Sequence, residues 1–153
     1  MTTNTNNSAG RTYAPINGIN LYYELHGTGT PLIMLHGGFG TFEMFTALSP
    51  TLATSHQVIG VDLYGHGRTA LTDRPIAFEQ MADDIGLLIQ DLGLEKANLL
   101  GYSLGGIIAE RTQPYNPFSV TIILSDGRTH PFGGCEAVPF VPSLQRRKRQ
   151  GPL

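Results

Sequence analysis

A serine between glycines is the residue in this sequence best placed to do chemistry. Ser103 lies in the stretch "NLLGYSLGGIIAE", where an apolar run ends at Gly101 and another apolar run follows Gly106. Residues 101–105 match G-x-S-x-G, the pattern of a nucleophile elbow between a strand and a helix. The glycines leave room for a strained backbone, and the turn lifts the hydroxyl clear of the sheet. The alternative interpretation is an ordinary glycine-rich strand-to-helix turn.

Two groups of backbone N–H donors are expected near this serine. The Leu104 N–H opens the next helix, where unpaired donors and the helix dipole favour an anion. The run "HGGFG", residues 36–40, closes an apolar strand, and glycines at a strand end allow backbone N–H groups to approach a ligand. Gly38 is the predicted second oxyanion donor, with Phe39 next in order. His36 is expected to be structural rather than a catalytic base.

A further glycine-containing loop, "DLYGHG", covers residues 62–67. Residues 65–70 fit G-x-G-x-x-A, a weak dinucleotide fingerprint, but that motif requires a helix to begin at once. Because "LTDRP" follows instead, nucleotide binding is rejected. Asp62 is expected to brace a turn, and His66 to lie in an exposed loop.

The hydrophobic pattern predicts the elements that carry these loops. A hairpin is expected over residues 13–26, with its turn at Asn17-Gly18. Buried strands are expected in "PLIMLHGG", "QVIGVDL", "KANLLG" and "FSVTIILS", a helix interrupted by Pro50 over residues 41–55, and a helix over residues 78–92 stopped by Gly93. This alternation predicts an α/β fold: a mostly parallel sheet with helices on both faces.

Composition limits the class of protein. The chain has 153 residues, enough for one compact core, with 41% hydrophobic and 14% charged residues. A single cysteine fits a reducing compartment, and "MTTNTNNSAG" has neither the basic nor the apolar region of a secretory signal. No apolar run reaches the roughly 20 residues of a membrane span. The expectation is a cytoplasmic protein, disordered over residues 1–11, with no cofactor, metal, nucleic acid or membrane partner and with its oligomeric state left open.

Residues 12–111 resemble the N-terminal half of the α/β-hydrolase family. The hairpin, the "HGGFG" loop, the D-x-x-G-x-G loop and "GYSLGG" appear in that family's order and spacing. The resemblance implies an incomplete α/β-hydrolase fold and a serine hydrolase that forms an acyl-enzyme from a small ester, lactone or amide. Ser103 would be the nucleophile, and no metal or organic cofactor would be needed.

The resemblance also implies an acid and a histidine after the serine. The candidates are Asp126 and His130, which either form an improvised pair or are solvent-facing loop residues; the second interpretation is favoured. Residues 112–153 are expected to be divergent and largely irregular, as if the chain ended early or lost its reading frame after Arg111. Charge changes there too, from five basic and ten acidic residues up to Arg111 to five basic and two acidic residues after it. The basic run Arg146–Arg149 is interpreted as solvated charge.

Two other functions stay open. One is a catalytically silent fragment, or a small binding or interaction protein that keeps the sheet without the triad. The other is a different reaction of the same fold family, which includes cofactor-free haloperoxidase-like enzymes and carbon–carbon bond hydrolases. For the serine hydrolase and for these other enzymes alike, the expected partner is a small-molecule substrate.

Overall fold

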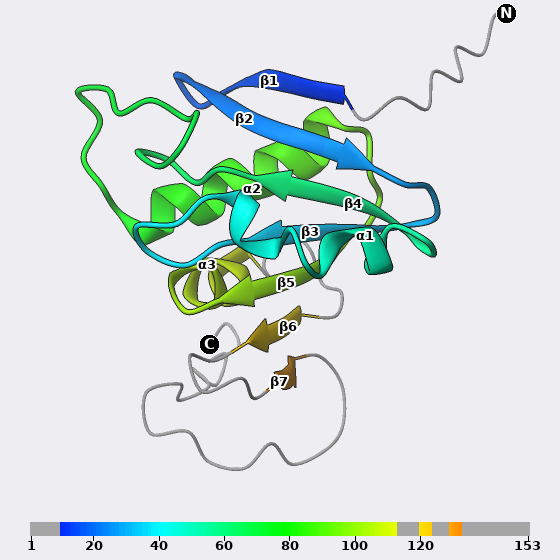
Figure 1. Ribbon diagram of the computed structural model, residues 1–153. Coiled ribbons are helices and arrows are strands. Elements are labelled where there is room, and N and C mark those ends of the chain that lie inside the picture. The colour runs from blue at the N-terminus through cyan, green and yellow to red at the C-terminus, as the bar shows by residue number, and fades with distance from the viewer. Residues whose placement is uncertain (1–9, 113–119, 124–128, 133–153) are drawn as a thin grey trace, which may run out of the picture.

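The computed structural model describes residues 10–112, 120–123 and 129–132, which form one seven-stranded sheet with helices against it (Figure 1). The strand order is β1-β2-β4-β3-β5-β6-β7. The strands are β1 (Gly10–Ile16), β2 (Ile19–His26), β3 (Thr30–Leu35), β4 (His56–Val61), β5 (Asn98–Tyr102), β6 (Val120–Ile123) and β7 (Thr129–Phe132). The helices are η1 (Phe42–Phe45, a 3-10 turn), α1 (Ser49–Leu52), α2 (Phe78–Asp91) and α3 (Leu104–Thr112).

The centre of the sheet is parallel, as predicted. Strands β4, β3, β5 and β6 pair in parallel, whereas β2 and β7 pair antiparallel to their neighbours at the two sides. Since β1 is antiparallel to β2, it runs in the same direction as the central strands. The carboxyl ends of β3, β4 and β5 therefore meet at one edge of the sheet, which is where open α/β sheets bind ligands.

The N-terminal hairpin turns where the sequence predicted. Asn17 and Gly18 both have positive φ, 49° and 80°, as a type I′ turn requires. The pairing of Ile16 with Ile19 leaves two residues in the turn. This hairpin lies beside β4 and extends the sheet on the side away from β5.

The parallel strands β3, β4 and β5 are buried on both faces because helices cover both. Along β3, Ile33 and Leu35 belong to a large core cluster with α2 and α3, and Leu32 and Met34 belong to a smaller cluster with η1. Adjacent side chains of a strand point to opposite faces, so the two clusters lie on opposite sides of the sheet. Helices on both faces are thus confirmed.

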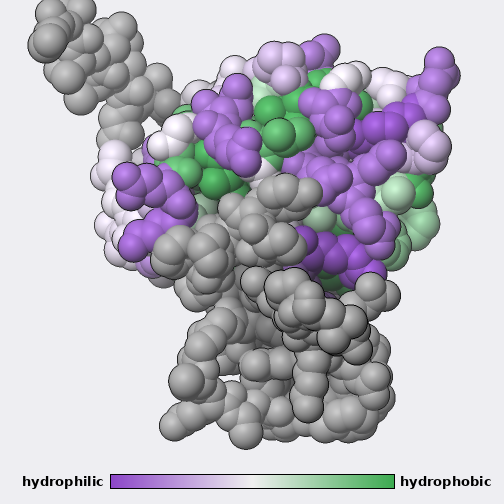
Figure 2. All heavy atoms as spheres, turned by 180° about the vertical axis from the view of Figure 1, so that it is seen from behind, coloured by the Kyte–Doolittle hydropathy of each residue, from purple (hydrophilic) through white to green (hydrophobic). Residues whose placement is uncertain are grey.

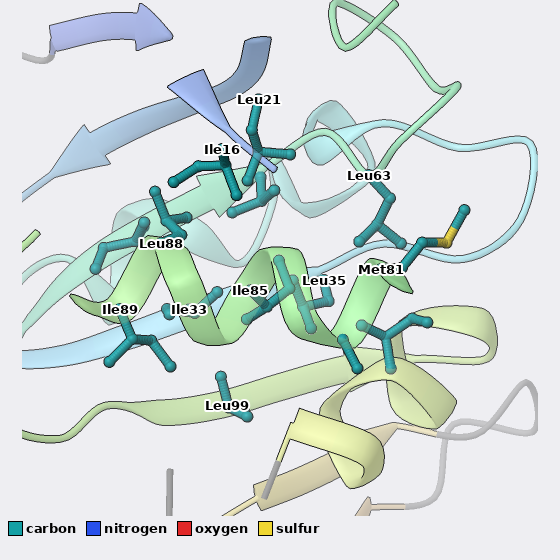
Figure 3. Packing of buried hydrophobic residues seen from close by; sticks show 14 of the residues in the cluster. Ile16, Leu21, Ile33, Leu35, Leu63, Met81, Ile85, Leu88, Ile89 and Leu99 are labelled. Atoms are coloured by element: carbon teal, nitrogen blue, oxygen red, sulfur yellow. The ribbon is translucent and has the colours of Figure 1, made fainter. Parts of the chain in front are cut away.

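Helix α2 forms because its apolar residues recur at three- and four-residue steps. Met81, Ile85, Leu88 and Ile89 are 0–3% exposed and point at the sheet (Figure 3). Burying one such side chain is worth about 1.5–3 kcal/mol, which makes this face the main anchor of the helix. The surface seen from the α2 side mixes many hydrophilic residues with smaller hydrophobic areas (Figure 2).

Three details differ from the sequence-based expectations. Residues 41–55 form η1 and α1 instead of one interrupted helix, and Pro50 lies in the first turn of α1, where a missing N–H costs nothing. Strand β1 begins at Gly10, within the stretch predicted to be disordered. Residues 129–132, predicted to be irregular, pair with β6. The start of β1 and the whole of β7 are strands because their backbones pair with a neighbouring strand. Segments this short show no recognisable hydrophobic alternation, so the sequence did not predict them.

Candidate active site

The three glycine-containing loops of the sequence meet at the carboxyl edge of the sheet. Strand β3 lies between β4 and β5, and Leu35 pairs with Val61 on one side and with Gly101 on the other. The loops that follow these strands therefore start side by side. The arrangement brings together the "HGGFG" loop, the loop after Asp62 and the serine corner.

Ser103 stands at the corner between β5 and α3 with an unusual backbone. Its φ is 50°, in the left-handed region that costs a residue with a side chain about 1–2 kcal/mol. The side chain is exposed, and α3 begins at the next residue. Its carbonyl accepts hydrogen bonds from the N–H groups of Gly106 (2.9 Å) and Ile107 (3.2 Å), which fix the first turn. A strained, exposed serine ahead of a helix is the geometry of a nucleophile elbow.

The two flanking glycines allow α3 to lie directly on the sheet. A Cβ on Gly105 would collide with the backbone carbonyls of Leu35 and His36, at the end of β3. A Cβ on Gly101 would collide with the backbone of Gly105 and Gly106. The spacing of the G-x-S-x-G motif is therefore required by backbone-to-backbone contact on both sides of Ser103.

The "HGGFG" loop lies against the same corner. A Cβ placed on Gly38 would be 4.0 Å from Leu104 Cδ2, and one on Gly37 would be 2.8 Å from the Tyr102 ring. The Gly40 N–H donates to the Gly37 carbonyl (3.1 Å), which closes residues 37–40 into a turn. Within that turn Phe39 has a φ of 60°, and its side chain is fully exposed. The turn that carries Gly38 and Phe39, two of the predicted oxyanion donors, thus lies next to Leu104, the third.

His36 is a structural residue, as expected. It is completely buried, its Nδ1 lies 2.7 Å from the Gly37 carbonyl, and its Nε2 accepts the Leu63 N–H (2.9 Å). This pattern requires the neutral ring with its proton on Nδ1, so both nitrogens are occupied. Burial lowers the pKa of His36 below its ordinary value of 6.5 and outweighs the hydrogen bond to Gly37, which raises it.

This burial predicts a loss of stability in acid. Because the folded pKa lies below 6.5, the unfolded chain takes up the proton first as the pH falls. The contribution of neutral His36 to the free energy of unfolding is therefore complete above pH 6.5. It is lost as the pH falls from that value to the folded pKa, by at most about 1.4 kcal/mol per pH unit. Urea unfolding at a series of pH values from 8 to 5 measures how steeply the free energy of unfolding falls with pH. This slope is expected to be smaller in His36→Gln. Identical slopes in the two proteins would contradict the assignment.

Asp62 does more than brace one turn. It is fully buried, and its Oδ1 accepts the Phe42 N–H (2.8 Å). Its Oδ2 accepts the backbone N–H (2.9 Å) and the Nε (3.0 Å) of Arg68, whose guanidinium also contacts Glu43. The carboxylate thereby ties the start of η1, and with it the end of the "HGGFG" loop, to the loop after β4. The role of Arg68 was not predicted, because its only signal in the sequence is an arginine six residues after a strand-end aspartate.

His66 was expected to be exposed and is instead half-buried. Its Nδ1 lies 3.0 Å from the Tyr64 carbonyl, and its ring centroid lies 5.1 Å from that of His36. The loop folds back over the end of β3 because Asp62 fixes both of its sides. His66 therefore helps to enclose His36.

The predicted acid and base are placed only in part. Asp126 lies outside the described residues, and for His130 the structure describes the backbone alone, in β7 opposite Ile122. Among the described side chains, no group of three or more histidine, cysteine or acidic residues could hold a metal ion. No helix in the described part is long and apolar enough to cross a membrane.

Comparison with known proteins finds hydrolases among the proteins that this chain resembles. The soluble epoxide hydrolase of Corynebacterium sp. (strain C12) is 33% identical over 96 residues, which cover 63% of this chain and 34% of that protein. The solved structure of the epoxide hydrolase CorEH superposes with a TM-score of 0.70 at 29% identity, covering 76% of this chain and 42% of the other. The solved structure of a marine microorganism esterase superposes with a TM-score of 0.62 at 32% identity, covering 68% of this chain and 40% of the esterase.

These matches fall on the part of the chain that carries the three loops. The chain spans between about a third and two fifths of the length of these relatives. The family model described as the alpha/beta hydrolase fold matches residues 30–112, more than half of the chain. That range begins at β3 and ends with α3, and it holds the "HGGFG" loop, Asp62 and Ser103. The chain belongs to the α/β-hydrolase fold family, many of whose members are hydrolases.

Proposed function

We propose that this chain carries the nucleophile and oxyanion site of a serine hydrolase that acts on a small ester, lactone or amide. The observation that carries the proposal is the backbone of Ser103: an exposed serine with a φ of 50°, followed at once by a helix. A hydroxyl held in this position needs no rearrangement to meet a substrate at the sheet edge. The strain has no evident structural benefit, and strained residues cluster at reactive sites.

The chemistry follows from the groups around that hydroxyl. Ser103 Oγ attacks the substrate carbonyl, and the carbonyl oxygen becomes an oxyanion. The N–H groups of Gly38 and Leu104 stabilise that charge, and each such donor is typically worth on the order of 10²–10³ in rate. Expulsion of the alcohol or amine leaves an acyl-enzyme, and water hydrolyses it to release the acid and restore the serine.

A serine nucleophile favours acyl substrates over epoxides, although two of the relatives above are epoxide hydrolases. An alkoxide that opened an epoxide would form an ether with the enzyme, and water does not readily cleave an ether. Attack on a carbonyl forms an ester, which water does cleave. The side chain at residue 103 therefore points to acyl transfer.

The candidate for proton transfer is His130, with Asp126 as its orienting acid. His130 is the one histidine that follows Ser103 in the sequence, and the serine needs such a base for attack. In the register, His130 lies opposite Ile122, which pairs with Gly101 of β5, so its backbone is two strand spacings, about 10 Å, from that of Gly101. That separation favours the second candidate, a protein that keeps the corner but is catalytically silent.

A fluorophosphonate probe on the purified chain distinguishes the two functions. The expected result is covalent labelling that is abolished in Ser103→Ala and falls by at least ~10²-fold in His130→Gln, the general range for acid–base catalysis. Labelling lost in Ser103→Ala but kept in His130→Gln would remove His130 from the mechanism. Absence of labelling in protein that unfolds cooperatively would support the silent protein and overturn the hydrolase.

A further inference from the structure

The thioether of Met44 lies on the glycine turn of the candidate oxyanion site. The Gly37 N–H donates a hydrogen bond to Met44 Sδ, with 3.4 Å between the two atoms. A Cβ placed on Gly40 would lie 3.6 Å from the same sulfur. The Met44 N–H in turn donates to the Thr41 carbonyl (3.1 Å), which fixes the backbone of Met44 within η1. The sulfur therefore accepts a hydrogen bond at one end of the turn at residues 37–40 and lies near its other end.

Met44 is also the methionine most open to reagents in the described part of the chain. The residue is 44% exposed, whereas Met34 is 0% and Met81 is 2% exposed. Oxidation of methionine by peroxides follows the exposure of the sulfur. The two buried methionines make internal standards for the reactivity of the exposed one.

We propose that Met44 is an oxidation-sensitive residue through which peroxide reversibly weakens the oxyanion turn. Hydrogen peroxide transfers one oxygen atom to the thioether, the O–O bond breaks, and the products are methionine sulfoxide and water. The sulfur is oxidised by two electrons and the peroxide is reduced by two. Methionine sulfoxide reductases reverse the change, each enzyme acting on one sulfoxide epimer.

The consequence for the turn follows from the geometry. Oxidation changes a weak, apolar acceptor into a polar group with a strong acceptor oxygen one bond further out. The Gly37 N–H can no longer keep its contact with sulfur and also meet that oxygen, so residues 37–40 must shift. Gly38 is the next residue, so a shift of the turn also moves its N–H, the proposed oxyanion donor. The effect on reactivity, unlike the modification itself, rests on the proposed function of Ser103.

The experiment exposes the full-length protein to hydrogen peroxide and locates each sulfoxide by fragment-ion mass spectrometry. We expect Met44 to oxidise at least ~10-fold faster than Met34 and Met81, because exposure controls access to sulfur. Hydrogen exchange of residues 37–40 should accelerate in the oxidised protein. Fluorophosphonate labelling of Ser103 should fall by about 10-fold, less than the loss of a whole oxyanion donor, and reductase treatment should restore it.

Met44→Leu is the matched control because leucine has a similar volume and no sulfur. It keeps the other oxidisable side chains, including Cys135. The ratio of labelling after and before oxidation should be close to one in this variant, whatever its starting rate. A similar drop in Met44→Leu, or oxidation of Met44 no faster than of Met34, would overturn the proposal. Faster exchange at residues 37–40 in protein that never labels would uphold the effect on the turn and overturn only the function proposed for Ser103.

Discussion

Replacing Asp62 with asparagine is expected to lower the free energy of unfolding by about 2–3 kcal/mol, the upper part of the range for a buried hydrogen-bonding group left without a partner. The Asp62 carboxylate is fully buried and accepts three N–H groups, one from Phe42 and two from Arg68. An asparagine has a single acceptor oxygen. Its amide group must then face either the two donors of Arg68 or the N–H of Phe42, so at least one buried donor is left without an acceptor.

Glu43→Gln is the control for this variant. Glu43 contacts the same guanidinium at 3.2 Å but is 70% exposed, and exposed ion pairs contribute about 0–1 kcal/mol. Equilibrium urea unfolding of the two variants measures the difference. If Asp62→Asn and Glu43→Gln lower the free energy of unfolding by the same amount, the buried carboxylate does not hold the two loops together.

The serine corner could be predicted from the sequence because its constraints are local. Gly101 and Gly105 lie two positions before and after Ser103, so the motif is recognisable within five residues, and Gly101 is required by the backbone of Gly105 and Gly106. The contact that requires Gly105, with Leu35 and His36 at the end of β3, lies outside the motif. The hairpin was predictable for the same reason, since Asn17-Gly18 has by itself the positive φ values that the turn needs. Local rules of this kind require no knowledge of the partner strand.

The network behind the corner could not be predicted, because its partners are distant in the sequence. Asp62 reaches Phe42 over 20 residues, and His36 reaches Leu63 over 27 residues. Such pairs depend on β4 lying next to β3, which hydrophobic periodicity does not specify. The contact of Met44 with Gly37 was hidden in the same way: the sequence shows only a methionine between Glu43 and Phe45, and the turn it contacts is a tertiary feature.

Replacing Gly105 with alanine is the second large effect expected. Alanine normally favours a helix over glycine by about 1 kcal/mol, so the substitution would be stabilising on a free surface of α3. Here the added methyl would collide with the carbonyls of Leu35 and His36, which are backbone and cannot rotate away. We therefore expect the substitution to destabilise the protein instead. The free energy of unfolding should fall by about 3 kcal/mol, at the upper end of overpacking effects, or the protein should fail to fold.

The same substitution at Gly38 separates this packing cost from any general effect of exchanging glycine for alanine. A methyl on Gly38 would meet only Leu104 Cδ2, at 4.0 Å, and no positive φ opposes it. Gly38→Ala should therefore change the free energy of unfolding by less than about 0.5 kcal/mol, as surface substitutions usually do. Thermal unfolding followed by circular dichroism compares the two. Equal melting temperatures would mean that α3 can move away from β3 without loss of stability. In that case the close packing of the helix on the sheet would not explain the strained conformation of Ser103.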